Sequence, residues 1–324
     1  MNSFRDCFRR AIACATFLAV AVAGKAGESV VAADGTGQFK AIQEAINAAP
    51  PTASASDPWT IRVRPGTYTE LVYVQREKHF VRLQGADPAT TILTFDLRAS
   101  MPGADGKPIG TFHTPTLWID GDDFTVSGLT IANSAGRVGQ ALALRADGDR
   151  ERFLNCRFLG WQDTILVNRG RQYFRDCRVE GAVDFIFGAA ASYFDHCTIV
   201  CTGNGYITAA STPAANPFGL VFTDCKIQGS DAKVETYLGR PWREYASVAF
   251  LRCDLSGEIR PEGWSNWQRT DRFKHARYVE YDNTGPGAAT VHRVPWSRQL
   301  SSAEAAAITP AAVLGGSDGW NPTK

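Results

Sequence analysis

Two aspartates, Asp163 and Asp184, are the residues of this sequence whose type and spacing best suit catalysis. Each lies in apolar and aromatic sequence, WQDTIL and VDFIFG, which is an unusual setting for a charge that is merely solvated. Two desolvated carboxyl groups held close together do not both ionise readily, so one keeps its proton while the other is an anion. Such a pair titrates as a unit and supplies a nucleophile or base beside a general acid, the chemistry that hydrolyses esters or glycosides. The alternative is that both are buried side chains that brace turns through backbone hydrogen bonds.

A repeat along the chain predicts that the two aspartates are neighbours in space. In five segments a Phe is followed three residues later by Cys and two residues further by an apolar residue. The pairs are Phe153/Cys156, Phe174/Cys177, Phe194/Cys197, Phe222/Cys225 and Phe250/Cys253, and a sixth copy has Phe124 with Ser127. Asp163 and Asp184 each follow their own Phe by ten residues. If the repeats stack, the two aspartates lie one strand spacing apart, about 5 Å.

The repeat unit predicts an all-β fold, a parallel β-helix. Consecutive copies begin 20 to 29 residues apart. The two residues after each Phe, of which at least one is polar, separate two short alternating apolar runs. Such a unit cannot bury its inner face alone and must stack on its neighbours. A β-sandwich is the alternative, but it gives no reason for Phe and Cys to recur at one register.

Helices are expected only at the two ends of this solenoid. The pattern over residues 39–46 predicts an N-terminal capping helix that ends before Pro50 and Pro51. Residues 302–314 form a weaker helix candidate, and residues 51–58 are expected to form a loop.

Composition and charge restrict the function and the location. The 324-residue chain is 44% hydrophobic, and its net charge of +1 excludes the strongly basic surface that non-specific nucleic-acid binding needs. Near the N-terminus, three arginines precede an alanine-rich apolar run that closes with an A-x-A site ending at Ala23. This pattern predicts a signal peptide over residues 1–23, cleaved near Ala23, and a secreted catalytic domain over residues 24–324 with no membrane anchor. A buried N-terminal helix is the alternative. We expect a monomer.

Five segments in this order resemble the signature blocks of pectin methylesterases, and the similarity runs from about Val30 to Trp320. The blocks are GTYTE at residues 66–70, GQALAL at 139–144, QDT at 162–164, DFIFG at 184–188 and LGRPW at 238–242. The resemblance implies a right-handed, single-stranded parallel β-helix of the pectin-lyase-like type. It also implies hydrolysis of methyl esters in homogalacturonan (pectin), giving pectate and methanol with no metal or other cofactor. The chain departs from the family pattern at Leu166, at Ala189 and over residues 210–212.

The resemblance also implies residue roles. Asp184 would attack the ester carbonyl, and Asp163 would protonate the departing methanol and then activate water. Gln162 and Gln140 would donate N–H groups to an oxyanion, and Arg240 would keep Asp184 ionised and oriented. The candidate substrate contacts are Thr111, Gln140, Phe187, Tyr206, Arg240 and Trp242, and the candidate disulfide joins Cys177 to Cys197.

Several of these residues also have purely structural interpretations. The glutamines could join a hydrogen-bonded ladder, Arg240 could be a structural ion-pair partner, and stacked cysteines make good small core residues. Trp264 and Trp267 could be platforms for a polysaccharide at the rim of the site or could pack in the core.

Three other functions remain as alternatives. A β-helical lyase or galacturonan hydrolase is the nearest, but a lyase would need a carboxylate cluster for Ca²⁺ and a basic proton abstractor, and no such cluster is apparent. A carbohydrate-binding β-helix would keep the aromatics without needing both stacked aspartates. A serine esterase would need an activating base, and the five histidines form no recognisable arrangement with a nucleophile-elbow motif.

Overall fold

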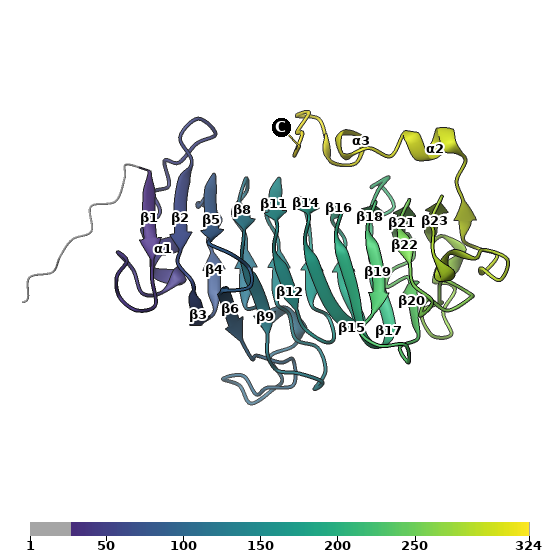
Figure 1. Ribbon diagram of the computed structural model, residues 1–324, viewed down its shortest axis with the longest axis horizontal. Helices are drawn as coiled ribbons and strands as arrows, with labels where there is room; N and C mark the ends of the chain where they lie inside the picture. Colours follow the sequence, from purple (N-terminus) through teal and green to yellow (C-terminus); the bar gives the residue numbers. More distant parts are fainter. Residues whose placement is uncertain (1–26, 324) are drawn as a thin grey trace, which may run out of the picture.

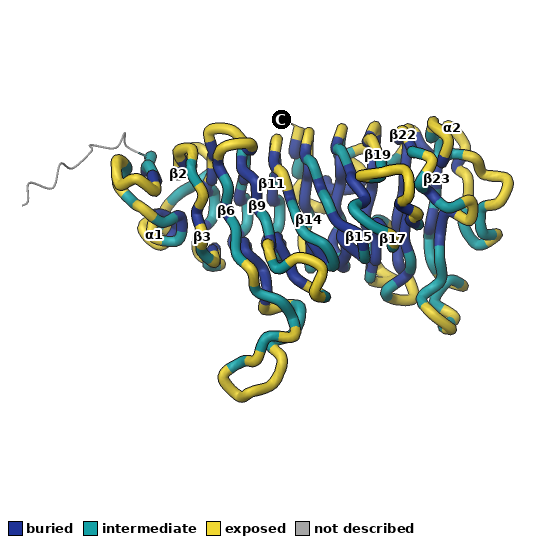
Figure 2. Tube along the Cα trace, turned by 60° about the horizontal axis from the view of Figure 1, so that its bottom comes forward, coloured by how far each residue is buried: buried dark blue, intermediate teal, exposed yellow. Residues whose placement is uncertain are grey.

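The chain winds into an elongated solenoid of parallel strands, and the computed structural model describes residues 27–323 (Figure 1). Two long sheets run along the solenoid, and each turn of the chain adds strands to both of them. Buried residues follow the strands, whereas exposed residues gather in the loops (Figure 2). The predicted parallel β-helix is therefore confirmed, while the signal peptide predicted over residues 1–23 lies outside the described residues.

In the described part of the chain, the first sheet has eleven strands and the second has thirteen. The first sheet contains, in spatial order, β1 (Glu28–Val31), β2 (Trp59–Val63), β5 (Val81–Gly85), β8 (Thr125–Ser127), β11 (Glu151–Leu154), β14 (Arg171–Arg175), β16 (Ala191–Asp195), β18 (Leu220–Thr223), β21 (Ser247–Leu251), β23 (Arg277–Tyr281) and β24 (Arg298–Gln299). The second sheet contains β3 (Gly66–Thr69), β4 (Val72–Val74), β6 (Thr91–Phe95), β7 (Leu117–Ile119), β9 (Thr130–Asn133), β10 (Leu144–Ala146), β12 (Arg157–Leu159), β13 (Ile165–Val167), β15 (Arg178–Gly188), β17 (Thr198–Ala210), β19 (Lys226–Gly229), β20 (Thr236–Gly239) and β22 (Asp254–Leu255).

The phenylalanines of the repeat form one stacked column inside the solenoid. From Phe153 to Phe250, consecutive ring centroids lie 4.4–4.5 Å apart, and the rings are nearly parallel. Each Phe pairs in register with the next one along the sheet. The second residue after each of these Phe residues has a left-handed backbone, with φ between 48° and 53°. It forms the bend predicted between the two apolar runs of each repeat. These residues are Asn155, Asp176, His196, Asp224 and Arg252. The same bend on each rung keeps the following positions in register.

The cysteines follow the Phe column but form no disulfide. All the described cysteines are buried free thiols: Cys156, Cys177, Cys197, Cys201, Cys225 and Cys253. The Cys177 Sγ donates to the Phe153 carbonyl at 3.3 Å, and the Cys197 Sγ donates to the Phe174 carbonyl at 3.6 Å. The Cys177–Cys197 disulfide implied by the resemblance is therefore wrong for this structure. Each of the five thiols of the Phe/Cys repeat donates to a backbone carbonyl of the preceding rung and fills the core as a small apolar group.

The helix at the N-terminal end, α1 (Ile42–Ala48), packs on β1, β2 and β4 and confirms the predicted cap. The predicted start at residue 39 is wrong because Phe39 forms a parallel bridge with Val31 instead. The helix begins where the Glu70 carboxylate accepts hydrogen bonds from the backbone N–H groups of Ile42 and Gln43, at 2.7 and 2.9 Å. A carboxylate at this end also complements the helix dipole.

The helix predicted over residues 302–314 is two short helices, α2 (Ser302–Ala306) and α3 (Pro310–Leu314). Pro310 cannot continue a helix from the preceding turn, so it starts a new one. The segment runs back along the outside of the first sheet, where Leu314 packs in a cluster with Tyr173 and Tyr193 (Figure 1). The loop predicted over residues 51–58 contains no helix or strand.

Candidate active site

The two aspartates occupy equivalent positions on adjacent rungs of the second sheet. Asp163 lies just before β13, and Asp184 lies in the middle of β15. Parallel pairing joins Ile165 to Ile186 within these strands. Each of these isoleucines follows its aspartate by two residues, so Asp163 and Asp184 occupy matching positions on adjacent rungs, as the repeat predicts.

The local backbone aims both side chains away from the regular strand pattern. Asp163 has φ 62° and Asp184 has φ 50°, the left-handed region that Asp enters more readily than most residues. The register between β15 and β17 also shifts twice between Gly181 and Ile186, a stretch that contains Asp184. Such bulges redirect a side chain, and strained backbone of this kind is concentrated at functional sites.

Arg240, which follows β20, binds Asp184 through both carboxylate oxygens. Its Nε lies 2.9 Å from Oδ1 and its Nη2 lies 2.6 Å from Oδ2. The guanidinium carbon lies 3.9 Å from the ring centroid of Tyr206 and 4.2 Å from that of Trp267. A bidentate pair held between two rings fixes the orientation of the Asp184 carboxylate.

The surroundings give the two carboxyl groups different proton affinities. Burial raises the pKa of Asp163 well above its ordinary value, and the nearby charge of Asp184 raises it further, against a smaller opposing effect of Arg240. Burial also raises the pKa of Asp184, and the hydrogen bonds and charge of Arg240 offset part of this rise, an opposing effect that is larger than at Asp163, where Arg240 acts by charge alone. We therefore assign the retained proton to Asp163 and the negative charge to Asp184.

Gln140 and Gln162 bring two side-chain amides to the same rungs. Backbone bridges connect Gln140 to Gln162 and Gln162 to Val183, the residue before Asp184. Neither side-chain amide forms a hydrogen bond with another group in residues 27–323. Their N–H groups are thus available to a ligand in the cavity.

These residues surround one cavity of about 350 Å³. Of the residues predicted for the site, those lining it are Thr111, Gln140, Gln162, Asp163, Asp184, Phe187, Arg240 and Trp242. Tyr206 does not line the cavity, and its ring packs against the Arg240 guanidinium. Of the two tryptophans left open by the sequence, Trp267 lines the cavity, whereas Trp264 is a core residue, 1% exposed, that donates to Glu280.

One wall of the cavity is aromatic. The Phe187 and Trp242 rings meet edge to face at 5.7 Å between centroids, and the Phe112 ring lies 6.4 Å from that of Trp242. Sequence reasoning missed Phe112, although it is adjacent to Thr111, and it left Trp267 undecided. A flat apolar wall facing polar groups suits a sugar ring, which has an apolar face and a hydroxyl edge.

A second group of acidic and histidine side chains lies outside this cavity. Among residues 27–323, Asp195, His196 and Asp224 are close enough together to hold a metal ion. The His196 Nδ1 lies 2.6 Å from Asp195, and Arg252 binds Asp224 at 2.8 Å, so these groups already have partners. None of the three lines the cavity.

A parallel β-helix whose cavity holds two carboxyl groups on adjacent rungs, one of them bound by an arginine, is an arrangement that suits acid–base hydrolysis. The chain belongs to the pectinesterase family, whose members are carboxylic ester hydrolases acting on pectin: the Pectinesterase family model matches residues 28–317.

Individual relatives agree with this assignment. The chain is similar to Pectinesterase 31 of Arabidopsis thaliana, with 39% identity over 281 residues that cover 85% of this chain and 88% of the relative. It resembles the solved pectin methylesterase from carrot, with a TM-score of 0.82, 33% identity and coverage of 90% and 93% of the two chains. It also resembles a solved pectin methylesterase in complex with a hexasaccharide, with a TM-score of 0.78, 29% identity and coverage of 91% and 98%. The fold is accordingly the right-handed parallel β-helix that the resemblance implies.

Proposed function

We propose that this protein hydrolyses the methyl esters of galacturonate units in pectin to pectate and methanol, with Asp184 as nucleophile and Asp163 as general acid and base. The observation that carries the proposal is the pair of carboxyl groups on adjacent rungs. Arg240 binds one of them, while the other is buried and makes no hydrogen bond or ion pair with residues 27–323. The solved relative in complex with a hexasaccharide supports a saccharide substrate.

In the first step, a carboxylate oxygen of Asp184 attacks the carbonyl carbon of the ester. The negative charge that develops on the carbonyl oxygen is stabilised by the N–H groups of Gln140 and Gln162. The bond to the methoxy oxygen then breaks as Asp163 gives its proton to that oxygen, and methanol leaves. An anhydride between Asp184 and the galacturonate carboxyl group remains.

In the second step, Asp163, now a carboxylate, takes a proton from water. The resulting hydroxide attacks the galacturonate carbonyl of the anhydride, which releases the galacturonate carboxyl group in its acid form and restores the anionic form of Asp184. The released acid then gives its proton to solvent. Asp163 ends the cycle protonated, so the pair returns to its starting state.

The direct test is to identify the products from highly methylated pectin in the presence of EDTA. We expect the purified protein to release methanol and to form no reducing or unsaturated chain ends. New chain ends would instead identify a hydrolase or a lyase. Binding of pectin without any product would identify a carbohydrate-binding β-helix.

Replacing either glutamine tests the oxyanion site. Because these amides would act on charge that appears only in the transition state, Gln162→Ala and Gln140→Ala should each lower kcat by about 10²–10³-fold with little change in KM. Steady-state methanol release measures both constants. The matched control is Gln228→Ala, a glutamine on β19 outside the cavity, which should match the unmodified protein. A raised KM at unchanged kcat would show that the amides only bind substrate.

Replacing Arg240 tests its effect on the charge of Asp184. Arg240 lowers the pKa of Asp184, so Arg240→Gln should raise that pKa. Activity requires the anion, and the acidic limb of the kcat/KM profile should therefore move to higher pH. Arg260→Gln, which removes a partly exposed arginine paired with Glu235, should leave the profile in place. An Arg240 variant that loses activity at every pH without moving the limb would contradict this role.

We also propose that the chain is secreted after removal of residues 1–23. Within the described residues, no helix is long and apolar enough to cross a membrane. The support is the arginine-flanked apolar run that ends at Ala23. N-terminal sequencing of protein recovered from the culture medium should begin near Gly24. An intact N-terminus on protein that remains inside the cell would refute the proposal.

A further inference from the structure

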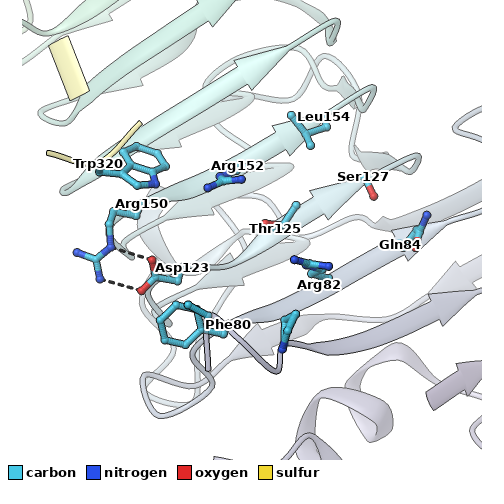
Figure 3. Close-up of a pocket in the computed structure, with 12 residues that line it drawn as sticks. Phe80, Arg82, Gln84, Asp123, Thr125, Ser127, Arg150, Arg152, Leu154 and Trp320 are labelled. Atoms are coloured by element: carbon cyan, nitrogen blue, oxygen red, sulfur yellow. Dashed lines mark hydrogen bonds and ion pairs between the residues drawn. The ribbon is translucent and has the colours of Figure 1, made fainter. Parts of the chain in front are cut away.

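A second groove lies on the outer face of the first sheet, apart from the catalytic cavity. Its volume is about 530 Å³, and strands β5, β8 and β11 form its floor (Figure 3). The two cavities share no lining residue.

The strand register places two arginines in one row on the floor of this groove. Arg82 on β5 pairs with Thr125 on β8, which pairs with Arg152 on β11. Residues in register on neighbouring strands project from the same face of the sheet, so the two guanidinium groups are rooted two strand spacings apart, about 10 Å. The Thr125 hydroxyl lies between them, and Figure 3 shows all three side chains along the floor.

The lining of the groove has more positive than negative charge. It contains three arginines and one aspartate, Asp123, and Arg150 already binds both oxygens of that aspartate at 2.8 Å. Arg82 is exposed and forms no hydrogen bond or ion pair with the part of the chain that the structure describes. Burial and the like charge of Arg82 lower the pKa of Arg152, and the charge of Asp123 opposes this in part.

One end of the groove is aromatic. Trp320, from the C-terminal segment, lies near Arg152, whose guanidinium carbon is 6.0 Å from the ring centroid. Phe80, from the bend before β5, lies across the Arg150–Asp123 pair from Trp320 (Figure 3). Aromatic rings suit the apolar face of a sugar, and Thr125 with its neighbours offers partners for sugar hydroxyls.

We propose that this groove is a second, non-catalytic binding site for an acidic oligosaccharide, with carboxylates on Arg82 and Arg152 and a sugar ring against Trp320. A guanidinium binds a carboxylate bidentately, and a chain of uronate units offers several carboxylates to the row. Naming the oligosaccharide as de-esterified galacturonan rests on the proposed function, whose product carries a free carboxylate on each hydrolysed unit. The site would hold the enzyme on polymer that it has already de-esterified.

Calorimetric titration with de-esterified trigalacturonate tests the proposal. We expect the purified protein to bind two molecules, one in each cavity. The double variant Arg82→Gln/Arg152→Gln should weaken one site by at least about tenfold and leave methanol release from a short methylated oligomer unchanged. Trp242→Ala should weaken the other site. Arg157→Gln, which removes an exposed arginine on β12 outside both cavities, is the matched control and should keep both sites.

The outcomes separate this proposal from the proposed function. A single site that is lost in Trp242→Ala and kept in the double variant would overturn the proposal. Inorganic phosphate that binds the groove as tightly as the oligomer, with neither ligand affected by Trp320→Ala, would overturn the assignment to a saccharide. Trigalacturonate binding that depends on Arg82, in a protein that releases no methanol, would refute the proposed function while supporting this site. Thermal melting curves that match the unmodified protein establish that each variant is folded.

Discussion

Asp184→Asn is expected to lower the rate of methanol release by at least about 10⁴-fold. The substitution keeps the shape of the side chain but replaces an anionic nucleophile with an amide that does not attack an ester. The Arg240 guanidinium, which is half-buried between two aromatic rings, also loses the negative charge of its partner, the Asp184 carboxylate. Initial rates at saturating methylated pectin measure the effect.

Asp176→Asn is the matched control for this substitution. Asp176→Asn is the same Asp-to-Asn substitution at another residue with a left-handed backbone, φ 53°. The Asp176 side chain is 60% exposed and lies outside the cavity. We expect it to retain the full rate. A folded Asp184→Asn protein that works within tenfold of the unmodified enzyme would rule out Asp184 as the nucleophile.

Asp163→Asn is expected to lower kcat by about 10²–10⁴-fold, the usual contribution of a general acid or base. Methoxide is a poor leaving group, and the variant has no proton to give it. The pH profile should change as well. Because the pKa of Asp163 is raised, its proton is present at low pH and is lost as the pH rises through that pKa, so the unmodified enzyme should lose activity on the alkaline side. The variant should lack this limb.

A substrate with a better leaving group separates the two duties of Asp163. An aryl ester of galacturonate needs little proton assistance to leave, but the anhydride still needs an activated water. Asp163→Asn should therefore release about one equivalent of phenol in a burst and then turn over slowly. A slow release with no burst, or a steady rate equal to that of the unmodified enzyme, would contradict the assignment of base to this residue.

The repeat explains why the centre of the site was predictable. Asp163 and Asp184 lie on regular rungs, where residues at the same distance along the chain from their Phe occupy the same position on adjacent rungs. The stacked rings from Phe153 to Phe250 hold this relation through several turns. The same regularity made the parallel β-helix and its burial pattern predictable.

The parts of the site that lie off the rungs were not predictable in this way. Phe112 and Trp267 reach the cavity from connections outside the strands, where no period relates sequence to position. Tyr206 was expected to touch substrate, but in the structure its ring packs against the Arg240 guanidinium and does not line the cavity. The sequence alone does not show which groups pack against this ring. The prediction of a disulfide between Cys177 and Cys197 was wrong for a related reason. Stacking brings thiols close together, but their orientation toward the backbone carbonyls decides whether they bond.

Trapping the covalent intermediate is the measurement that tests the central claim most directly. The enzyme would be quenched with acid during turnover of a methylated galacturonate oligomer, with hydroxylamine present in a parallel reaction, and its peptides mapped by mass spectrometry. We predict an oligomer adduct or a hydroxamate on Asp184, and neither in Asp184→Asn nor with de-esterified oligomer. An adduct on another side chain, or full methanol release with Asp184 unmodified at every quench time, would contradict the account.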